Sequence, residues 1–224
     1  MKKRIKIDST LLSFIIIMTG FLFTFRGLYS RNPLLDDTLD FVGFMVLLAG
    51  ILLRMSARGH KKAHSDKSQK LVVTGPYTLI RNPMYLGSFL MGAGFILMVW
   101  PWWSLPIFGA LFYVRFKKEV VKEEKYLAKL AKEEYEAYCA RVPRIFPSLK
   151  QWRQAKINEV INLEEAFSTK EQRGLWGWPV LAVLLESFQE QLIFEETLPS
   201  HTIMIFLMAA VVFVAGFAYL RQRK

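Results

Sequence analysis

The chain has 224 residues, of which 53% are hydrophobic, and its 30 Lys and Arg against 19 Asp and Glu give a formal charge of +11. The mean hydropathy is +0.23, and the apolar residues gather into runs of about eighteen or more, long enough to cross a bilayer. This clustering excludes a soluble doubly wound enzyme, a disordered chain and a collagen-like protein. The single cysteine, Cys139, excludes a disulfide scaffold.

The basic residues fill the short segments between the apolar runs and do not form a patch on a soluble face. Such a pattern is typical of cytoplasmic loops of membrane proteins and of attraction to anionic head groups. We therefore expect membrane lipids as partners and no binding of nucleic acid.

The first two spans are predicted at about 11–28 and 39–55, joined by a polar turn at 30–37. Four Lys and Arg precede the first span, as in a signal sequence, but no small-residue cleavage site follows it. We interpret it as an uncleaved helix whose N-terminus lies in the cytoplasm.

A third span is predicted at 83–100 and a fourth at 105–116, with Trp102 and Trp103 marking an interface turn between them. The following segment, 117–173, is too charged to enter lipid. Helix formers throughout 119–141 predict a cytoplasmic helix, followed by an interfacial stretch.

The end of the chain allows two topologies, because 202–220 is a clear span whereas 175–194 carries polar residues. If both segments cross, 28 of the 30 Lys and Arg lie on the cytoplasmic side, which favours six spans over five. The rival is an in-plane amphipathic helix at 175–194. We interpret Glu186 as an interface residue on a tilted or in-plane helix, with a functional site inside a span as the alternative. The expected fold class is thus an all-α integral membrane protein with about five to six transmembrane helices and a cytoplasmic helical region.

One segment predicted to be cytoplasmic, 75–87, has a combination of residues that a loop between two spans does not need. Gly75-Pro76 predicts a turn, and Asn82 before Pro83 predicts a helix start with Asn82 as N-cap. The N-terminus of the third span would then present free N–H groups and a positive dipole to an anion such as a carboxylate.

A second segment, 123–147, combines carboxylates with phenols. On a helix Glu123, Leu127, Leu130 and Tyr138 lie along one stripe, so that a carboxylate and a phenol could share a cavity. Glu124 and its charged neighbours are more typical of a solvated face.

His60 and His64 have the i, i+4 spacing of a metal-binding pair. The sequence places them in a polar loop and offers no third ligand nearby. We expect no metal.

Together the two segments resemble a superfamily of integral-membrane methyltransferases, which includes isoprenylcysteine carboxyl methyltransferases and phospholipid N-methyltransferases. Its pattern is G-P-Y-x-x-x-R-H-P-x-Y-x-G, then E-E-x-x-L-x-x-x-F-G-x-x-Y-x-x-Y-x-x-x-V-P-R. The spacing agrees throughout, over about 71–147, and the departures are Asn82 for His, Ala131 for Phe and Lys132 for Gly. The matching residues are Gly75, Pro76, Tyr77, Arg81, Pro83, Tyr85, Gly87, Glu123, Glu124, Leu127, Tyr135, Tyr138, Val142, Pro143 and Arg144.

The resemblance implies a cytoplasmic pocket for S-adenosylmethionine that opens sideways to the bilayer. It divides the chain into a transmembrane methyltransferase core, 1–150, with cofactor motifs at 71–87 and 119–147, and a region 151–224 with an interfacial segment and one or two C-terminal spans. The implied cofactor-binding residues are Tyr77, Arg81, Asn82, Pro83, Tyr85, Gly87, Glu123 and Glu124, and the implied catalytic residues are Glu123, Arg144 and Tyr138.

The physical properties of these side chains suit that donor. Tyrosines such as Tyr77, Tyr85 or Tyr138 could face the sulfonium or the adenine. Glu123 could accept the amino group or the ribose hydroxyls, and Arg81 could hold the carboxylate.

Two residues allow more than one role. Asn82 can form hydrogen bonds but cannot act as a general base where the family often has His. Arg144 could pair with an acidic substrate or a head-group phosphate, and a snorkelling interface arginine is the alternative.

The expected acceptor is lipidic or apolar: an isoprenylcysteine-like carboxylate, a phospholipid amine or a thiol. An NADPH-dependent membrane sterol or enone reductase shares a similar first motif, but Glu123-Glu124 replaces the Arg/Asp-rich nucleotide motif expected there. A catalytically silent membrane binding protein is the third interpretation. We expect the protein in the cytoplasmic membrane, with the endoplasmic reticulum as the alternative.

Overall fold

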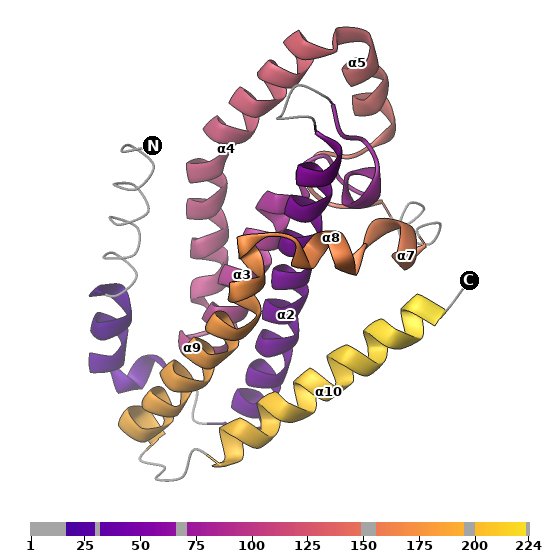
Figure 1. Ribbon diagram of the computed structural model, residues 1–224. Helices are drawn as coiled ribbons and strands as arrows, with labels where there is room; N and C mark the ends of the chain where they lie inside the picture. The colour runs from indigo at the N-terminus through magenta and orange to yellow at the C-terminus, as the bar shows by residue number, and fades with distance from the viewer. Residues whose placement is uncertain (1–16, 30–31, 66–70, 149–155, 195–199, 223–224) are drawn as a thin grey trace.

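The computed structural model describes residues 17–29, 32–65, 71–148, 156–194 and 200–222, and within these ranges the regular structure is helical (Figure 1). Residues 17–24 form a helix, and the first six residues of the predicted span, 11–16, lie outside the described residues. The long elements are α2 (Pro33–His64), α3 (Pro83–Val99), α4 (Ser104–Leu130), α5 (Lys132–Arg141), α9 (Gly174–Gln189) and α10 (Ser200–Gln222). The short elements are η1 (Arg26–Leu28), η3 (Gly75–Thr78), α7 (Ile157–Val160), α8 (Leu163–Phe167), η4 (Lys170–Arg173) and the π-helical turn η5 (Glu190–Phe194).

Helix α2 is longer at both ends than the predicted span. It runs unbroken for 32 residues, about 48 Å, so the polar turn expected at 30–37 and the loop expected around His60 are wrong over the described residues. The earlier start of α2 has a local cause. The Asn32 side chain accepts a hydrogen bond from the Leu35 N–H, and Pro33 takes the first helical position. Helix α3 agrees with the prediction and ends one residue earlier.

Helices α2 and α3 approach each other at their glycines. A Cβ on Gly50 of α2 would lie 2.8 Å from the carbonyl oxygen of Gly87, and one on Gly94 of α3 would lie 2.6 Å from that of Gly43. Small residues permit such close backbone packing between apolar helices. Gly87 therefore contributes to helix packing.

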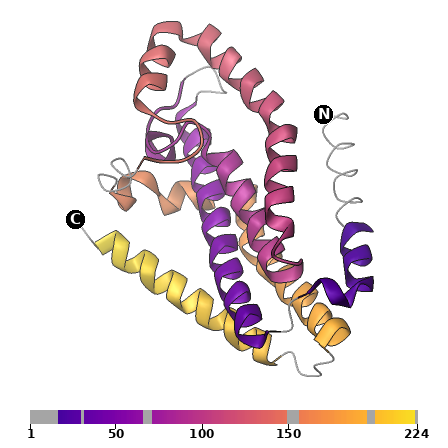
Figure 2. The same cartoon turned by 180° about the vertical axis from the view of Figure 1, so that it is seen from behind.

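The apolar core is shared between α2 and the C-terminal helices. The ring of Phe44 stacks on Phe206 of α10 with centroids 4.5 Å apart, and Ala182 of α9 is fully buried in the same cluster. Helix α10 packs on α2 through its first half and diverges from it toward the C-terminus (Figures 1 and 2).

Helices α2 and α10 are long and apolar enough to cross a membrane, and α3 is a shorter apolar helix of 17 residues. Large apolar side chains on α9 and α10 are exposed, as lipid-facing residues would be. The protein is thus helical and membrane-associated in character. The count of five or six spans, and whether 175–194 crosses, stay predictions.

The boundary between helices α4 and α5 differs from the predicted helix boundaries. Helix α4 continues without a break from the apolar 105–116 into the charged residues up to Leu130, and the chain then turns at Ala131, where φ is −148°. The single helix expected over 119–141 is therefore wrong, because it breaks at this turn. The turn directs α5 back toward the C-terminal end of α2 (Figure 1).

Candidate functional site

The first motif forms a tight turn beside α2. Gly75 has a φ of +59°, a conformation that glycine adopts without strain. A Cβ there would lie 2.8 Å from the imidazole of His60. The predicted Gly75-Pro76 turn is confirmed as the start of the 3₁₀ turn η3.

A backbone hydrogen bond joins the two motifs, because the Arg81 N–H donates to the Pro143 carbonyl over 2.9 Å. The side chain of Asn82 strengthens this junction: its Nδ2 donates to the Arg144 carbonyl at 3.2 Å and to Glu124 Oε1 at 3.4 Å. Asn82 occupies the N-cap position of α3, as predicted, but its side chain makes no capping hydrogen bond. It binds the second motif instead.

Glu124 accepts hydrogen bonds from residues of both motifs at this junction. The sequence suggested a solvated face for Glu124, and this expectation is wrong. The Arg144 guanidinium donates to both of its carboxylate oxygens, with Nε 2.9 Å from Oε1. Arg81 Nη1 lies 3.8 Å from the same oxygen. The hydrogen bond to Glu124 raises the pKa of Arg144 above its ordinary value. Only 14% of the Glu124 side chain is exposed, so this network fixes the two motifs together.

Between the motifs lies a cavity of about 240 Å³. Five of the residues predicted for the site line it: Tyr77, Arg81, Asn82, Glu123 and Tyr138. Leu127 of the predicted stripe lines it as well, and the other lining residues are Lys61, Leu71, Val72 and Tyr126. The stripe meets the cavity through the turn at Ala131 and not along one straight helix.

Glu123 faces a partner that sequence reasoning missed. Lys61 Nζ, from the C-terminal end of α2, lies 2.7 Å from Glu123 Oε1. No motif contains Lys61, and only the unexpected length of α2 brings it to the cavity. The cavity therefore holds a carboxylate with its own counterion.

The two buried phenols that line the cavity, those of Tyr77 and Tyr138, both donate hydrogen bonds. Tyr138 donates its hydroxyl proton to the Tyr77 carbonyl over 2.7 Å, and Tyr77 donates to the Ala57 carbonyl over 3.4 Å. Burial raises the pKa of Tyr77 and of Tyr138 well above the ordinary value, and raises that of Tyr135 to about 12. At neutral pH these side chains are hydrogen-bond donors and not bases.

Comparison with known proteins agrees with this geometry. The family described as phospholipid methyltransferase matches residues 39–134, which contain the first motif, Glu123 and Glu124. The chain is also similar to the proteins named Protein-S-isoprenylcysteine O-methyltransferase of two yeasts. These matches support its similarity to the methyltransferase superfamily that contains both.

These similarities cover part of each protein. The Schizosaccharomyces pombe relative is 30% identical over 114 residues, 47% of this chain and 48% of its own length. The Saccharomyces cerevisiae relative is 31% identical over 134 residues, 56% of each. A nickel-cobalt-cadmium resistance protein of Alcaligenes xylosoxydans xylosoxydans is 32% identical over 87 residues, 39% of this chain and 40% of its own length. The chain thus spans about half the length of the curated relatives it matches, and no solved structure matches it.

The remaining residues of the superfamily pattern lie outside the cavity lining. Pro83 is buried as the first residue of α3, and Tyr85 packs edge-on against Phe116 with ring centroids 5.6 Å apart. Gly87 faces α2, while Glu124 and Arg144 form the network behind the cavity wall.

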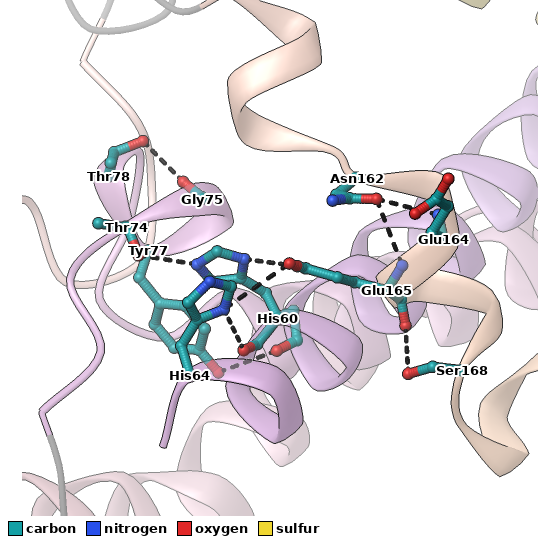
Figure 3. A network of polar contacts seen from close by, with 11 residues as sticks. His60, His64, Thr74, Gly75, Tyr77, Thr78, Asn162, Glu164, Glu165 and Ser168 are labelled. Carbon is teal, nitrogen blue, oxygen red and sulfur yellow. Dashed lines mark hydrogen bonds and ion pairs between the residues drawn. The ribbon is translucent and has the colours of Figure 1, made fainter. Parts of the chain in front are cut away.

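A further network joins His60, His64 and Thr74, within the 39–134 match, to Glu165 of α8 beyond it, and so ties the C-terminal region to the first motif (Figure 3). His60 Nδ1 lies 2.7 Å from Glu165 Oε2, and His60 Nε2 lies 2.8 Å from the Thr74 hydroxyl. His64 Nδ1 lies 3.8 Å from Glu165 Oε1. The expectation that this histidine pair has no third ligand nearby is wrong, because α8 brings Glu165 to it. The signal was too remote in sequence to be recognised.

Proposed function

We propose that the chain is an S-adenosylmethionine-dependent methyltransferase that acts at the membrane on a lipidic or apolar acceptor. The observation that carries this proposal is the meeting of the two motifs at one cavity that offers a cation, a carboxylate and aromatic rings. The volume of about 240 Å³ is just below the usual range of about 300–1,000 Å³ for small-molecule sites. We expect the exposed Tyr126 at its rim to move when the donor binds.

The polar groups fit the donor's functional groups. Arg81 lines the cavity, and its Nε–H is buried without an acceptor in the described structure, so it has capacity for a carboxylate. Helix α3 begins there without a side-chain cap, which adds a positive dipole end. Glu123 would accept the donor's amino group or ribose hydroxyls, with Lys61 holding the carboxylate in place.

When bound, the donor supplies a methyl group on a sulfonium that carries its own leaving group. The chain's residues then have to align donor and acceptor and exclude water. Because Tyr77 and Tyr138 stay protonated and already donate to backbone carbonyls, they position the cavity wall and remove no proton.

A carboxylate acceptor fits this environment best, since it is methylated on oxygen without losing a proton. The two yeast relatives are named for O-methylation of isoprenylcysteine. We therefore place a carboxylate on an apolar or prenylated chain first, ahead of a phospholipid amine or a thiol, which would need a base.

The cavity would lie on the cytoplasmic side of the membrane. The end of α2 beside it carries Arg54, Arg58, Lys61 and Lys62, and the positive-inside rule assigns such clusters to the cytoplasm. In this proposal residues 1–150 form the methyltransferase core.

The deciding experiment is calorimetric titration of detergent-purified protein with S-adenosylhomocysteine, beside NADPH. Saturable binding of the first compound alone is expected. Arg81→Ala and Glu123→Ala should each reduce its affinity at least tenfold, whereas Glu133→Ala, on the exposed face of α5, should not. Binding of NADPH alone would support the reductase, and binding of neither would support a silent membrane protein. Methyl transfer to prenylcysteine carboxylates, phospholipid amines and thiols would then identify the acceptor.

A further inference from the structure

A second group of charged residues lies at the opposite end of the bundle, where α2 begins and α9 ends (Figure 1). Asp36 and Asp40 come from the first two turns of α2, and Glu186 comes from the last turn of α9. One carboxylate oxygen from each lies within 4.8 Å of the other two. Glu186 is 0% exposed and Asp40 is 1% exposed, so Glu186 lies in the protein interior, and the interpretation of it as a membrane-interface residue stays a prediction.

Two carboxylates of this acidic cluster, those of Asp40 and Glu186, have buried oxygens without a hydrogen-bond donor among the described residues. Asp40 Oδ1 and both oxygens of Glu186 are buried without a partner in the described structure, and so is the amide oxygen of Gln189, one turn after Glu186. Glu190 is buried next to Gln189 and accepts a hydrogen bond from Thr202. A buried carboxylate without a partner is among the costliest arrangements in a protein, and a bound cation removes that cost.

The ligand set defines the kind of cation. Oxygens that all lie within 4.8 Å of one another can surround an ion at about 2.0–2.6 Å, which is the range for magnesium and calcium. Carboxylate and amide oxygens are the ligands of hard divalent ions, and no softer nitrogen or sulfur ligand belongs to this group.

We propose that Asp36, Asp40 and Glu186 bind a hard divalent cation that fastens α9 to α2. This departs from the expectation that the chain binds no metal. The site does not serve the donor cavity, because Asp40 and Lys61 are 21 residues apart on one helix, about 30 Å. The proposal is independent of the methyltransferase function.

The other group with metal-type ligands, His60, His64 and Glu165, has its hydrogen bonds made. Both ring nitrogens of His60 contact oxygen atoms, and His64 Nδ1 lies 3.1 Å from the His60 carbonyl (Figure 3). A metal there would have to displace existing partners, whereas at the acidic cluster it would supply missing ones.

The test uses the full chain in detergent, treated with EDTA and then titrated with Mn²⁺, whose free form is measured by electron paramagnetic resonance. We expect one saturable site, competition by Ca²⁺ or Mg²⁺, and a rise in melting temperature on binding. Asp40→Asn and Glu186→Gln should weaken Mn²⁺ binding at least tenfold. Asp37→Asn is the matched control, because Asp37 is on the same turns of α2 but 41% exposed.

Absence of saturable binding to the wild-type protein would overturn the proposal, as would equal affinity in the two variants. If the variants do not fold, infrared spectra of the wild-type protein decide: a carboxylate band that shifts with Mn²⁺ supports the site. A protonated carboxyl band that is unchanged by Mn²⁺ would show that protons, and not a cation, neutralise the cluster.

Discussion

The acidic side chains at the two ends of α2 differ in whether they have partners. At the cavity end four partly buried acidic side chains face a cation or a histidine: Glu123 with Lys61, Glu124 with Arg144, Glu165 with His60 and Glu171 with Arg54. At the opposite end Asp40 and Glu186 have oxygens with no partner in the described structure. Among the described residues, the first end pairs its own charges, whereas the second has buried carboxylate oxygens that a proton or a cation would neutralise.

The contrast follows from how charge is distributed along the sequence. Basic residues gather in the segments that the positive-inside rule assigns to the cytoplasm, so acids there find partners within the chain. Few Lys and Arg are present in the segments assigned to the other side. Among the described residues, the buried oxygens of Asp40 and Glu186 at that end have no hydrogen-bond partner.

The largest expected effect comes from breaking the cavity end at Glu124. Glu124→Ala would leave Arg144, Arg81 and the Asn82 amide without their shared acceptor. We expect the free energy of unfolding to fall by about 3 kcal/mol, at the low end for a buried ion pair because Arg144 is partly exposed. Chemical denaturation in detergent measures it, with Glu133→Ala as the control. A loss no larger than in the control would show that the network does not hold the motifs together.

A substitution of the same kind at the other end should have the opposite sign. Glu186→Leu removes a fully buried carboxylate, so in EDTA we expect the free energy of unfolding to rise by about 2 kcal/mol. The same denaturation experiment checks it, and Glu190→Leu is a contrasting variant that should destabilise, because Thr202 would lose its acceptor. Destabilisation by Glu186→Leu would mean that the carboxylate has a partner even without added metal.

A smaller effect is expected where the C-terminal region meets the cavity end. Glu165→Gln weakens the contact with His60, and through it the support of Thr74 and the Gly75 turn. We expect a loss of about 1.5 kcal/mol in stability and a several-fold weaker affinity for S-adenosylhomocysteine. Glu164→Gln, on the exposed neighbour, should change neither. If donor affinity is unchanged, α8 stabilises the bundle without positioning the first motif.

Local signals in the sequence predicted what short-range chemistry determines. Asn82-Pro83 gave the correct start of α3, and Gly75-Pro76 gave the turn. The stripe expected on one helix predicted that Glu123 and Tyr138 could share a cavity, and both line it, although the helix breaks between them at Ala131. The roles of these residues in binding and catalysis stay predictions.

Long-range packing supplied what the sequence did not show. The break at Ala131 has no glycine or proline to mark it, so a run of helix formers concealed it. Lys61 reaches Glu123 only because α2 continues past the apolar segment, and Glu165 reaches His60 across 105 residues. Contacts of this kind depend on how helices cross, which periodicity in one segment does not encode.

The smallest effect on stability is expected from the buried phenol of Tyr138 at the cavity end. Burial raises the pKa of Tyr138 in the folded protein, so its contribution is fully present below pH 10.0, the ordinary value, and is lost as pH rises toward the folded pKa. Tyr138→Phe should destabilise by about 1 kcal/mol at pH 8, because the hydrogen bond to Tyr77 is lost. By pH 10.5 this difference should shrink by about 0.8 kcal/mol, since the variant has one phenol fewer to ionise. Denaturation at the two pH values measures the change, and Tyr126→Phe, an exposed phenol, should show none. If the stability difference between wild type and Tyr138→Phe is the same at both pH values, the Tyr138 hydroxyl is open to solvent. The ion pairs alone would then hold the cavity end together.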